Sequence, residues 1–461
     1  MIALSTHSAR RQALYEQLNR PILLMGNQSR IRNLPMNAVP FRQDSTFLYF
    51  TGCDVPGAAA LIDGFGTTLF LAPPADDDAL WHGHLDTFED LRARYGVDRV
   101  RDIATLEDHA PASAATLAVG DTQATHRAAR ITGSPMRYGG EDGDEALMHA
   151  VIHMRRTKTD DELAEHRVAA GFTAAAFKAA MSGTSVGGHE AHIAALFDGV
   201  LAARGCTTGY HSIVTVRGEV LHMPHYENVL EDGQLLLLDG GAERPSGYGV
   251  DITRTWPVNG TFSGRQRSAY EAVLESQKQA IAMCTAGTRY RDIHLHAGRV
   301  LAQWGLDEGL FRGSIDEIMA KHAQAVFFPH GVGHLLGMDV HDLEQFGDQA
   351  AYGPGRARSP HFGTAYLRLD LDLEPGHLVT IEPGFYVVPA ILRDPSLRSA
   401  YGETVNWEAA ESWMPFGGIR IEDDVLVTSD QPEVLTHDTP KEVAAVEALV
   451  GSGPSALERL S

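Results

Sequence analysis

The second half of the chain carries six residues whose types and order two divalent metal ions would explain. Each follows an apolar run or lies at a turn: Asp239 in LLLLDGG, Asp251 in GYGVDITRT, His330 and His334 in FFPHGVGHLLG, Glu382 in TIEPG and Glu422 in GIRIEDD. Four carboxylates in one pocket would repel one another, because like charges about 4 Å apart cost on the order of 4 kcal/mol per pair at an effective dielectric near 20. Two divalent ions would balance that charge, and a neutral imidazole would complete a coordination sphere made mostly of oxygen.

The donor set also indicates which metal to expect. Oxygen-rich sites with one histidine suit Mn²⁺ or Co²⁺, and the absence of thiolate ligands removes the strongest preference for Zn²⁺. We therefore expect two divalent ions per chain, with Mn²⁺ favoured and Co²⁺ or Zn²⁺ as alternatives. Paired ions roughly 3.5–4 Å apart would share a hydroxide and polarise a carbonyl oxygen, which is the two-metal route to hydrolysis.

Each acid taken alone has a simpler explanation, as an exposed residue or as the partner of an arginine. Arg254 follows Asp251, and Arg420 precedes Glu422. The joint pattern carries the argument, because TIEPG and GIRIEDD place acids inside apolar strand sequence, where an unpaired charge is costly. The HGVGH segment is weaker by itself, since two histidines four residues apart could equally form a hydrogen-bonded turn.

Composition narrows the class of protein. The chain has 461 residues, 44% of them hydrophobic, and a formal net charge of −22, with 38 basic residues against 60 acidic ones. Length favours two domains, and the negative charge argues against a nucleic-acid surface. Three cysteines without a CxxC pair encode neither a disulfide framework nor a cysteine-ligated zinc site. The first residues contain no continuous apolar stretch, so neither a signal peptide nor a membrane anchor is expected, and a cytoplasmic location follows by default.

The elements that must position these residues fall into two predicted domains. Residues 1–155 alternate helix-like and strand-like segments, such as PILLMG and TTLFLAPP, as in a small α/β unit. Thr159 and Glu162 form a capping box that opens a long helix of the second domain, 156–461. There we expect further helices at about 189–203 and 265–283, strands including FFPH, TIEPGFYVV and GIRIEDDVLV, and loop insertions at 347–363 and 389–418. An α+β domain with a curved antiparallel sheet fits this order.

Three other patterns resemble catalytic motifs without their required context. Gly183, Ser185 and Gly187 spell GxSxG, but a nucleophile elbow follows a strand, and here a helix is expected before it. The segment HEAH at 189–192 is one residue too short for a zincin motif. His294 and His296 lie two apart on a helical segment and face different directions, so a structural role is expected for them.

At these motifs the chain resembles the proline peptidases with the pita-bread fold, aminopeptidase P and prolidase. FRQDSTFLYFTG resembles a segment of their creatinase-like amino-terminal domain. The catalytic-domain resemblance is carried in order by five segments: DGQLLLLDGG, GYGVDITRTWPVNG, FFPHGVGHLLGMDVHD, TIEPGFY and PFGGIRIEDD. The resemblance implies an α+β pita-bread catalytic domain preceded by a smaller α/β creatinase-like domain, and hydrolysis of the bond between an N-terminal residue and proline.

The resemblance also implies a role for each site residue. Asp239 would hold one metal, Asp251 and Glu422 would bridge both, and His334 with Glu382 would complete the other, with a bridging hydroxide as nucleophile and Glu382 receiving its proton. The remaining expected positions are the substrate-contacting His341, His330 in the proline pocket, His222 or its near competitor His225 at the oxyanion, and Tyr386 and Arg420 beside the carboxylate ligands. A surface or turn position is the alternative for His222, His225 and His341.

The sequence indicates two possible lengths for the peptide substrate, a dipeptide or a longer chain. GTAYLRLDLDLEPG resembles prolidases, in which Arg368 would hold the carboxylate of an Xaa-Pro dipeptide; a solvated loop arginine is the alternative. The first domain is more similar to aminopeptidase P, where a tryptophan loosely matched by Trp81 contributes to a neighbouring subunit. Near Asn37 there is no clear acid to hold the substrate's amino group, so recognition there could differ.

Our prediction is a cytoplasmic Xaa-Pro aminopeptidase or dipeptidase that acts on proline-containing di- or oligopeptides. It would use two metals and form a homodimer or homotetramer, with neither nucleic acid nor membrane as a partner. A metal-free creatinase-type enzyme would lack the acids, and a non-catalytic pita-bread binding protein would have lost several of them.

Overall fold

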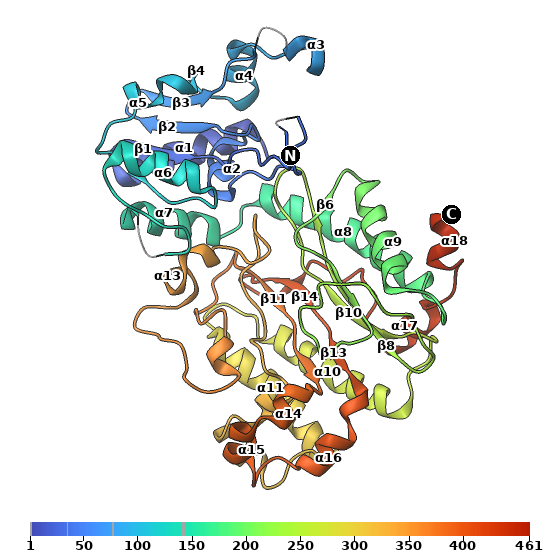
Figure 1. Cartoon of the computed structure of the whole chain (residues 1–461). Helices are drawn as coiled ribbons and strands as arrows, with labels where there is room; N and C mark the ends of the chain where they lie inside the picture. Colours follow the sequence, from blue (N-terminus) through green and yellow to red (C-terminus); the bar gives the residue numbers. More distant parts are fainter. Residues whose placement is uncertain (1, 35, 76–77, 141–142) are drawn as a thin grey trace. The chain divides into compact units, whose positions relative to one another are not determined.

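The computed structural model describes residues 2–34, 36–75, 78–140 and 143–461 (Figure 1). Backbone contacts divide the chain into two compact units. One holds the described residues up to Arg155 together with Leu343–Ala350, and the other holds Arg156–Asp342 and Ala351–Ser461. Both units combine helices with sheets, which confirms the α+β class expected from the sequence.

The first unit is built on a five-stranded mixed sheet in the order β4-β3-β2-β1-β5. Its strands are β1 (Ile22–Met25), β2 (Ala59–Asp63), β3 (Gly66–Leu71), β4 (Arg99–Asp102) and β5 (Ala115–Thr116). The pairs β1–β2 and β2–β3 are antiparallel, while β3–β4 and β1–β5 are parallel. Its helices are α1 (Leu4–Leu18), α2 (Ser45–Thr51), α3 (Asp78–His82), α4 (Phe88–Tyr95), α5 (Leu106–His109), α6 (Thr122–Thr132) and most of α7 (Glu145–Arg156). Leu23, Leu61 and Phe70 bury the side of the sheet that faces Ala124 and Ala128 of α6.

The second unit distributes its strands over four small antiparallel sheets, β10-β8-β7, β11-β14-β15, β12-β13 and β6-β9. The strands are β6 (Thr207–Thr208), β7 (Ile213–Thr215), β8 (Leu235–Asp239), β9 (Ala242–Glu243), β10 (Thr253–Pro257), β11 (Leu378–Ile381), β12 (Gly384–Tyr386), β13 (Gly418–Arg420), β14 (Asp423–Leu426) and β15 (Glu433–Val434). Strand β13 also lies against β8 and β10, so these sheets meet where β8 ends and β10 begins.

Two pairs of long helices pack on these sheets (Figure 1). Helices α8 (Asp160–Ser182) and α9 (Glu190–Ala202) contact each other and the strands β6, β7 and β9. Helix α10 (Gly264–Ala282) contacts β11, β12 and β13, and α11 (Tyr290–Asp307) packs on α10. As expected, α8 begins at a capping box, in which Glu162 accepts hydrogen bonds from the backbone N–H and the hydroxyl of Thr159, each at 2.9 Å. The GxSxG segment lies in the turn between α8 and α9, as its sequence context indicated.

Two local predictions were wrong. The FFPH segment is not a strand: it leaves the 3₁₀ turn Ala323–Val326 as irregular backbone, and the Phe327 carbonyl accepts a hydrogen bond from the Tyr386 N–H at 2.9 Å. The region 389–418, predicted to be a loop, folds largely into the short helices α14 (Pro389–Arg393), α15 (Pro395–Tyr401) and α16 (Trp407–Ser412). Pro389 and Pro395, which suggested a loop, each begin a helix, where the missing N–H costs nothing.

Three short helices complete the second unit: α12 (Ile315–Ala320), α17 (Val443–Leu449) and α18 (Ala456–Leu460). Helix α13 (Asp348–Ala351) belongs to the first unit except for its last residue. Among the described residues, no helix combines the length and the apolar character that crossing a membrane requires.

Candidate metal centre

The four acids reach one place because each stands where a strand begins or ends. Asp239 is the last residue of β8 and pairs with Thr253, the first residue of β10, which puts Asp251 beside it. Glu422 lies between β13 and β14, and its N–H donates to the Thr253 carbonyl at 3.0 Å. Glu382 directly follows β11, whose partner in the sheet is β14. The pairing of these strands therefore brings together residues that are up to 183 positions apart in the chain, from Asp239 to Glu422.

Three overlapping groups of ligand atoms lie within 4.8 Å of one another. They are Asp239 with Asp251 and Glu422, His334 with Glu382 and Glu422, and Asp251 with His334 and His341. Glu422 joins the first two groups, so its carboxylate is placed between Asp239 and Asp251 on one side and His334 and Glu382 on the other. The structure thus brings together all five residues expected to be metal ligands, and it adds His341 at their edge.

Four of those five side chains are buried, and Glu382 is half-buried. Burial together with the neighbouring carboxylates raises the pKa of Asp251 to about 7 and that of Glu382 to about 8. The pKa of Glu422 lies well above its ordinary value for the same two reasons. Only one guanidinium, that of Arg420, bonds to a carboxylate of this set, which leaves most of the negative charge uncompensated by the described side chains. This excess of buried carboxylate oxygens fits divalent cations as the missing positive charge.

His334 has the orientation of a metal ligand. Its Nδ1 lies 2.9 Å from the Leu335 carbonyl, which can only accept, so Nδ1 carries the proton and Nε2 is the unprotonated ring nitrogen. Nε2 lies 3.5 Å from the Asp251 carboxylate and 3.6 Å from that of Glu382. This tautomer therefore directs its unprotonated nitrogen toward the acids.

Two residues that the sequence did not single out bond directly to the acids. The Tyr210 hydroxyl contacts the carboxylates of both Asp239 and Asp251. The Thr253 hydroxyl lies 2.7 Å from Glu422 Oε2 and accepts from Arg420 Nε at 3.0 Å. Thr253 could have been found, because it lies two residues after Asp251 on an extended segment and so shares its side. Tyr210 lies between β6 and β7 in TTGYHSIV and gives no comparable signal.

Arg420, Tyr386 and His330 form a connected chain beside the carboxylates. Arg420 bonds to Asp239 through one guanidinium nitrogen and donates to the Tyr386 hydroxyl at 3.0 Å through another. Tyr386 in turn lies 2.9 Å from His330 Nε2, while His330 Nδ1 lies 2.7 Å from the Gly331 carbonyl. Burial and Arg420 lower the pKa of His330 to about 3, so this imidazole is neutral near pH 7.

The three other expected histidines differ in how close they lie to the acids. The His341 ring stands edge-on to His334 at 4.5 Å, and its Nε2 lies 2.9 Å from an Arg368 guanidinium nitrogen. The pKa of His222 is lowered, mainly by burial. His222 is also close enough to Arg420 and Asp239 for their charges to act on it: Arg420 lowers the pKa and Asp239 raises it. His225 is exposed and makes no hydrogen bond or ion pair with any described residue. The structure therefore brings His341 and Arg368 to the site and His222 within reach of the charges of Arg420 and Asp239, while His225 bonds to no described residue.

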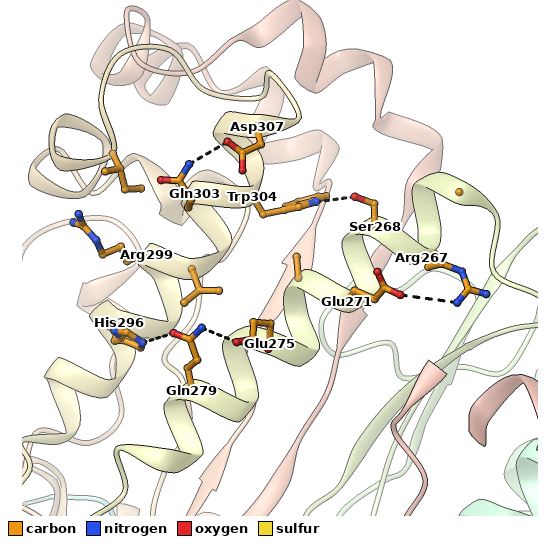
Figure 2. Close-up of a pocket in the computed structure, with 14 residues that line it drawn as sticks. Arg267, Ser268, Glu271, Glu275, Gln279, His296, Arg299, Gln303, Trp304 and Asp307 are labelled. Atoms are coloured by element: carbon orange, nitrogen blue, oxygen red, sulfur yellow. Dashed lines mark hydrogen bonds and ion pairs between the residues drawn. The ribbon is translucent and has the colours of Figure 1, made fainter. Parts of the chain in front are cut away.

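A groove of about 720 Å³ between α10 and α11 is a weaker candidate for a functional site (Figure 2). Its polar side chains bond mainly to one another or to neighbours: His296 to Gln279 at 2.8 Å, Gln279 to Glu275 at 2.7 Å, and Trp304 to Ser268 at 2.9 Å. None of the acids described above lines it. The structural role expected for His296 stays a prediction, which its bond to Gln279 supports.

Comparisons with known proteins agree with this geometry. Residues 164–429 match Metallopeptidase family M24, and residues 7–118 match the Aminopeptidase P N-terminal domain. A probable Xaa-Pro aminopeptidase of Verticillium alfalfae is 33% identical over 94% of this chain and 92% of its own length. One from Penicillium rubens is 35% identical over 89% of both chains. Among solved structures, Pseudomonas aeruginosa aminopeptidase PepP matches with a TM-score of 0.81 at 30% identity over 97% of this chain and 98% of that one. Escherichia coli aminopeptidase P with the inhibitor Pro-Leu matches with a TM-score of 0.79 at 28% identity, with the same coverage.

Proposed function

Because the chain belongs to metallopeptidase family M24, we propose that it hydrolyses the peptide bond between an N-terminal residue and proline, with two divalent ions per chain. The enzyme is a metallopeptidase with the pita-bread fold of its structural neighbours. One observation carries the proposal most strongly: the five expected ligands gather at one point, with Glu422 common to two groups. The Xaa-Pro aminopeptidase relatives support proline specificity.

In this proposal Asp239, Asp251 and Glu422 would hold one ion, His334, Glu382 and Glu422 would hold the other, and Asp251, whose ligand atom also lies within 4.8 Å of that of His334, would contribute to both. When bound, the ions would lower the pKa of a water molecule and polarise the substrate carbonyl. Mn²⁺ is the favoured metal because four of the five ligand side chains are carboxylates and only one is an imidazole.

Glu382 is the carboxylate best placed to receive a proton from the attacking water. Its side chain is 15% exposed, compared with 6% for Asp251 and 11% for Asp239. A general base must reach both the water and the substrate, and the partial exposure of Glu382 meets that requirement. The chain from Arg420 through Tyr386 to His330 would orient the ligand Asp239 and one wall of the proline pocket.

His222 and His341 are the proposed contacts for the substrate carbonyl. Both lie at the edge of the acids, and burial lowers the pKa of His341 to about 3 and also lowers that of His222, so both are neutral near pH 7. A neutral imidazole with one N–H donates to an oxyanion as the negative charge develops. His225, which bonds to no described residue, is the weaker choice for this role.

Dipeptide hydrolysis is the second candidate, favoured by the position of Arg368. Its guanidinium lies against His341, at the partly exposed edge of the site, where the carboxylate of an Xaa-Pro dipeptide would be captured. The curated relatives favour the broader aminopeptidase activity.

The remaining features are also proposals. We place the domain boundary at residue 155, which the two matched families support by falling on either side of it. A cytoplasmic location is supported by three buried cysteines that are all free thiols. We expect a homodimer or homotetramer.

Metal analysis followed by peptide assays tests the function. The purified chain should contain about two divalent ions, lose activity on Ala-Pro and Ala-Pro-Ala in a chelator, and regain it with Mn²⁺. Full activity after complete removal of metal would overturn the metal-dependent mechanism. Hydrolysis of Ala-Ala-Ala at the same rate as Ala-Pro-Ala would overturn the specificity for proline.

A further inference from the structure

A second group of basic and imidazole side chains lies at the start of α11, apart from the metal centre. Arg291 and His294 are three residues apart on the first turns of this helix and therefore share a face. His322 precedes the 3₁₀ turn Ala323–Val326, and the ring of His361 stacks on it with centroids 4.6 Å apart and planes 20° apart. We call these four residues the α11 basic cluster.

Packing places the three segments of this cluster together. Gly298 lies one turn after His294, and a side chain there would meet Gln324 Cγ at 3.2 Å, so Gln324 covers this face of α11. Gly363, two residues after His361, lies against Ala325 in the same way. The turn that carries His322 and Gln324 is thus held between α11 and the loop that carries His361.

Several buried polar atoms in this region have no hydrogen-bond partner among the described residues. They are Arg291 Nε, His294 Nδ1, His322 Nδ1 and Gln324 Oε1. His294 is 2% exposed and Gln324 is 3% exposed. An unsatisfied buried polar atom costs roughly 1–3 kcal/mol, and three unpartnered nitrogens in one place indicate that a further group accepts hydrogen bonds from them, whereas Gln324 Oε1 can itself only accept.

The charge of the α11 basic cluster indicates the sign of that group. Arg291 forms no ion pair with any acid in the described part of the chain. Burial lowers the pKa of His294 to about 4, with His322 and Arg291 as further causes, and burial, His361 and Arg291 lower that of His322. The two histidines are therefore neutral near pH 7 and offer ring N–H donors, and Arg291 is the charged side chain of the cluster. The N-terminus of an 18-residue helix whose N-cap side chain makes no capping bond adds to this positive charge.

We propose that the α11 basic cluster binds a small oxyanion, with Arg291 as the charged anchor and His294, His322 and His361 as hydrogen-bond donors. This site is distinct from the metal centre. The Phe328 ring lies between them, with its centroid 5.3 Å from that of His294 and 5.0 Å from that of His330. A tetrahedral inorganic anion and a free carboxylate share this chemistry, since both offer oxygen acceptors to a guanidinium and imidazole N–H groups.

Calorimetric titration of the metal-loaded chain at constant ionic strength tests the site, with sodium sulfate in one arm and sodium acetate in the other. The variants are Arg291→Gln and His361→Asn, and Arg299→Gln is the matched control. Arg299 lies on the same helix but is exposed, pairs with Asp316 at 2.8 Å, and lines the groove between α10 and α11 (Figure 2). His361 is exposed, so its variant should fold even if a change at Arg291 disturbs the helix start.

The wild type and Arg299→Gln should bind one anion with equal affinity, and Arg291→Gln should bind it about tenfold or more weakly, as expected for loss of a charged hydrogen bond. His361→Asn should weaken binding less. Saturation by sulfate alone would identify a tetrahedral anion, and saturation by acetate would identify a carboxylate; either supports the site. Absence of binding in both arms, or equal binding by the wild type, Arg291→Gln and His361→Asn, would overturn it.

Discussion

The hydroxyl of Tyr210 serves two metal-ligand candidates at once, which makes it a sensitive test of the centre. It bonds to both Asp239 and Asp251, and the substitution Tyr210→Phe would remove that bond while keeping the ring. We expect metal affinity or kcat/KM to fall by about 10- to 100-fold, the usual effect of losing a group that orients a ligand. Metal titration and steady-state assays would measure the two effects separately.

Tyr95→Phe is the matched control for that substitution. Tyr95 also donates to a carboxylate, that of Asp54 at 2.9 Å, but it belongs to the first unit. The control should keep full metal affinity. If Tyr210→Phe did the same, the hydroxyl would have no part in holding the ligands.

Arg368 separates the two candidate peptide-length classes. If its guanidinium holds the carboxylate of an Xaa-Pro dipeptide, Arg368→Ala should weaken kcat/KM on Ala-Pro by roughly 10- to 150-fold, equivalent to about 1.5–3 kcal/mol. The loss on Ala-Pro-Ala should be much smaller, because its carboxylate lies one residue further on. Arg167→Ala, at an exposed ion pair on α8, should change neither rate. Equal losses on the two peptides would remove the anchor role of Arg368.

At the scale of single residues, the sequence identifies charged side chains that stand in apolar segments. It does not identify side chains, such as Tyr210, that reach the site only because of how the chain folds. Asp239, Asp251, Glu382 and Glu422 could be proposed because acids beside apolar strands need compensation. Tyr210 could not, since a tyrosine before a strand is ordinary in a core. The choice of His222 over His225 stays a prediction, because the two lie only three positions apart on an irregular segment.

A buried ionic network centred on Asp423, the first residue of β14, connects the strands that carry the ligands. Its carboxylate accepts from Arg254 at 2.7 Å, Lys441 at 2.6 Å and Gln277 at 2.8 Å. Arg254 also donates to the Glu422 carbonyl at 2.5 Å. Burial raises the pKa of Asp423, but Arg254 and Lys441 outweigh it and hold the pKa at about 2.

We therefore expect Asp423→Asn to destabilise the chain by about 3–5 kcal/mol, because it leaves the buried Arg254 and Lys441 without their counter-ion. Chemical unfolding followed by circular dichroism would measure the loss. Asp430→Asn, on an exposed turn of the same region, should change stability by less than about 0.5 kcal/mol. A loss at Asp423 as small as that at Asp430 would show that the network contributes no net stability.

Elements with a strong local signal could be predicted, and elements that depend on distant partners could not. The capping box of Thr159 and Glu162 located the start of α8, and the apolar run before Asp239 located β8. The FFPH segment has the composition of a strand, but Pro329 lacks a donor, and the Phe327 carbonyl is taken by a residue 59 positions later, Tyr386. Pairing of that kind is invisible in a single sequence.

At the scale of the whole molecule, stability must depend on pH differently with and without metal. Burial raises the pKa of Asp251 to about 7 and that of Glu382 to about 8 in the metal-free protein, above the values of about 4 expected in the unfolded chain. The folded state then binds more protons than the unfolded state, so the metal-free chain should lose stability as pH rises from about 4 to 8. Bound cations keep these carboxylates ionised and should abolish that loss.

Buried histidines act in the opposite direction and equally in both forms. Burial lowers the pKa of His166 to about 4 and that of His377 to about 3, so the unfolded chain binds more protons below about 6.5. Their contribution to stability is present above pH 6.5 and is lost as pH falls toward 4. Because both histidines lie outside the ligand set, this effect cancels when the metal-loaded and the chelated chain are compared at one pH.

The difference in melting temperature between the metal-loaded and the chelated chain should therefore grow steadily between pH 5.5 and 8. Each kcal/mol should appear as roughly 2–4 °C, and the comparison is best made at one scan rate, since a chain of two units need not unfold reversibly. Asp251→Asn removes one of the titrating carboxylates, so the melting temperature of its chelated form should fall less between pH 5.5 and 8 than that of the chelated wild type. A difference between the loaded and chelated wild type that stayed constant with pH would mean that the buried acids are already neutralised within the protein, and the case for a cation at their centre would fail.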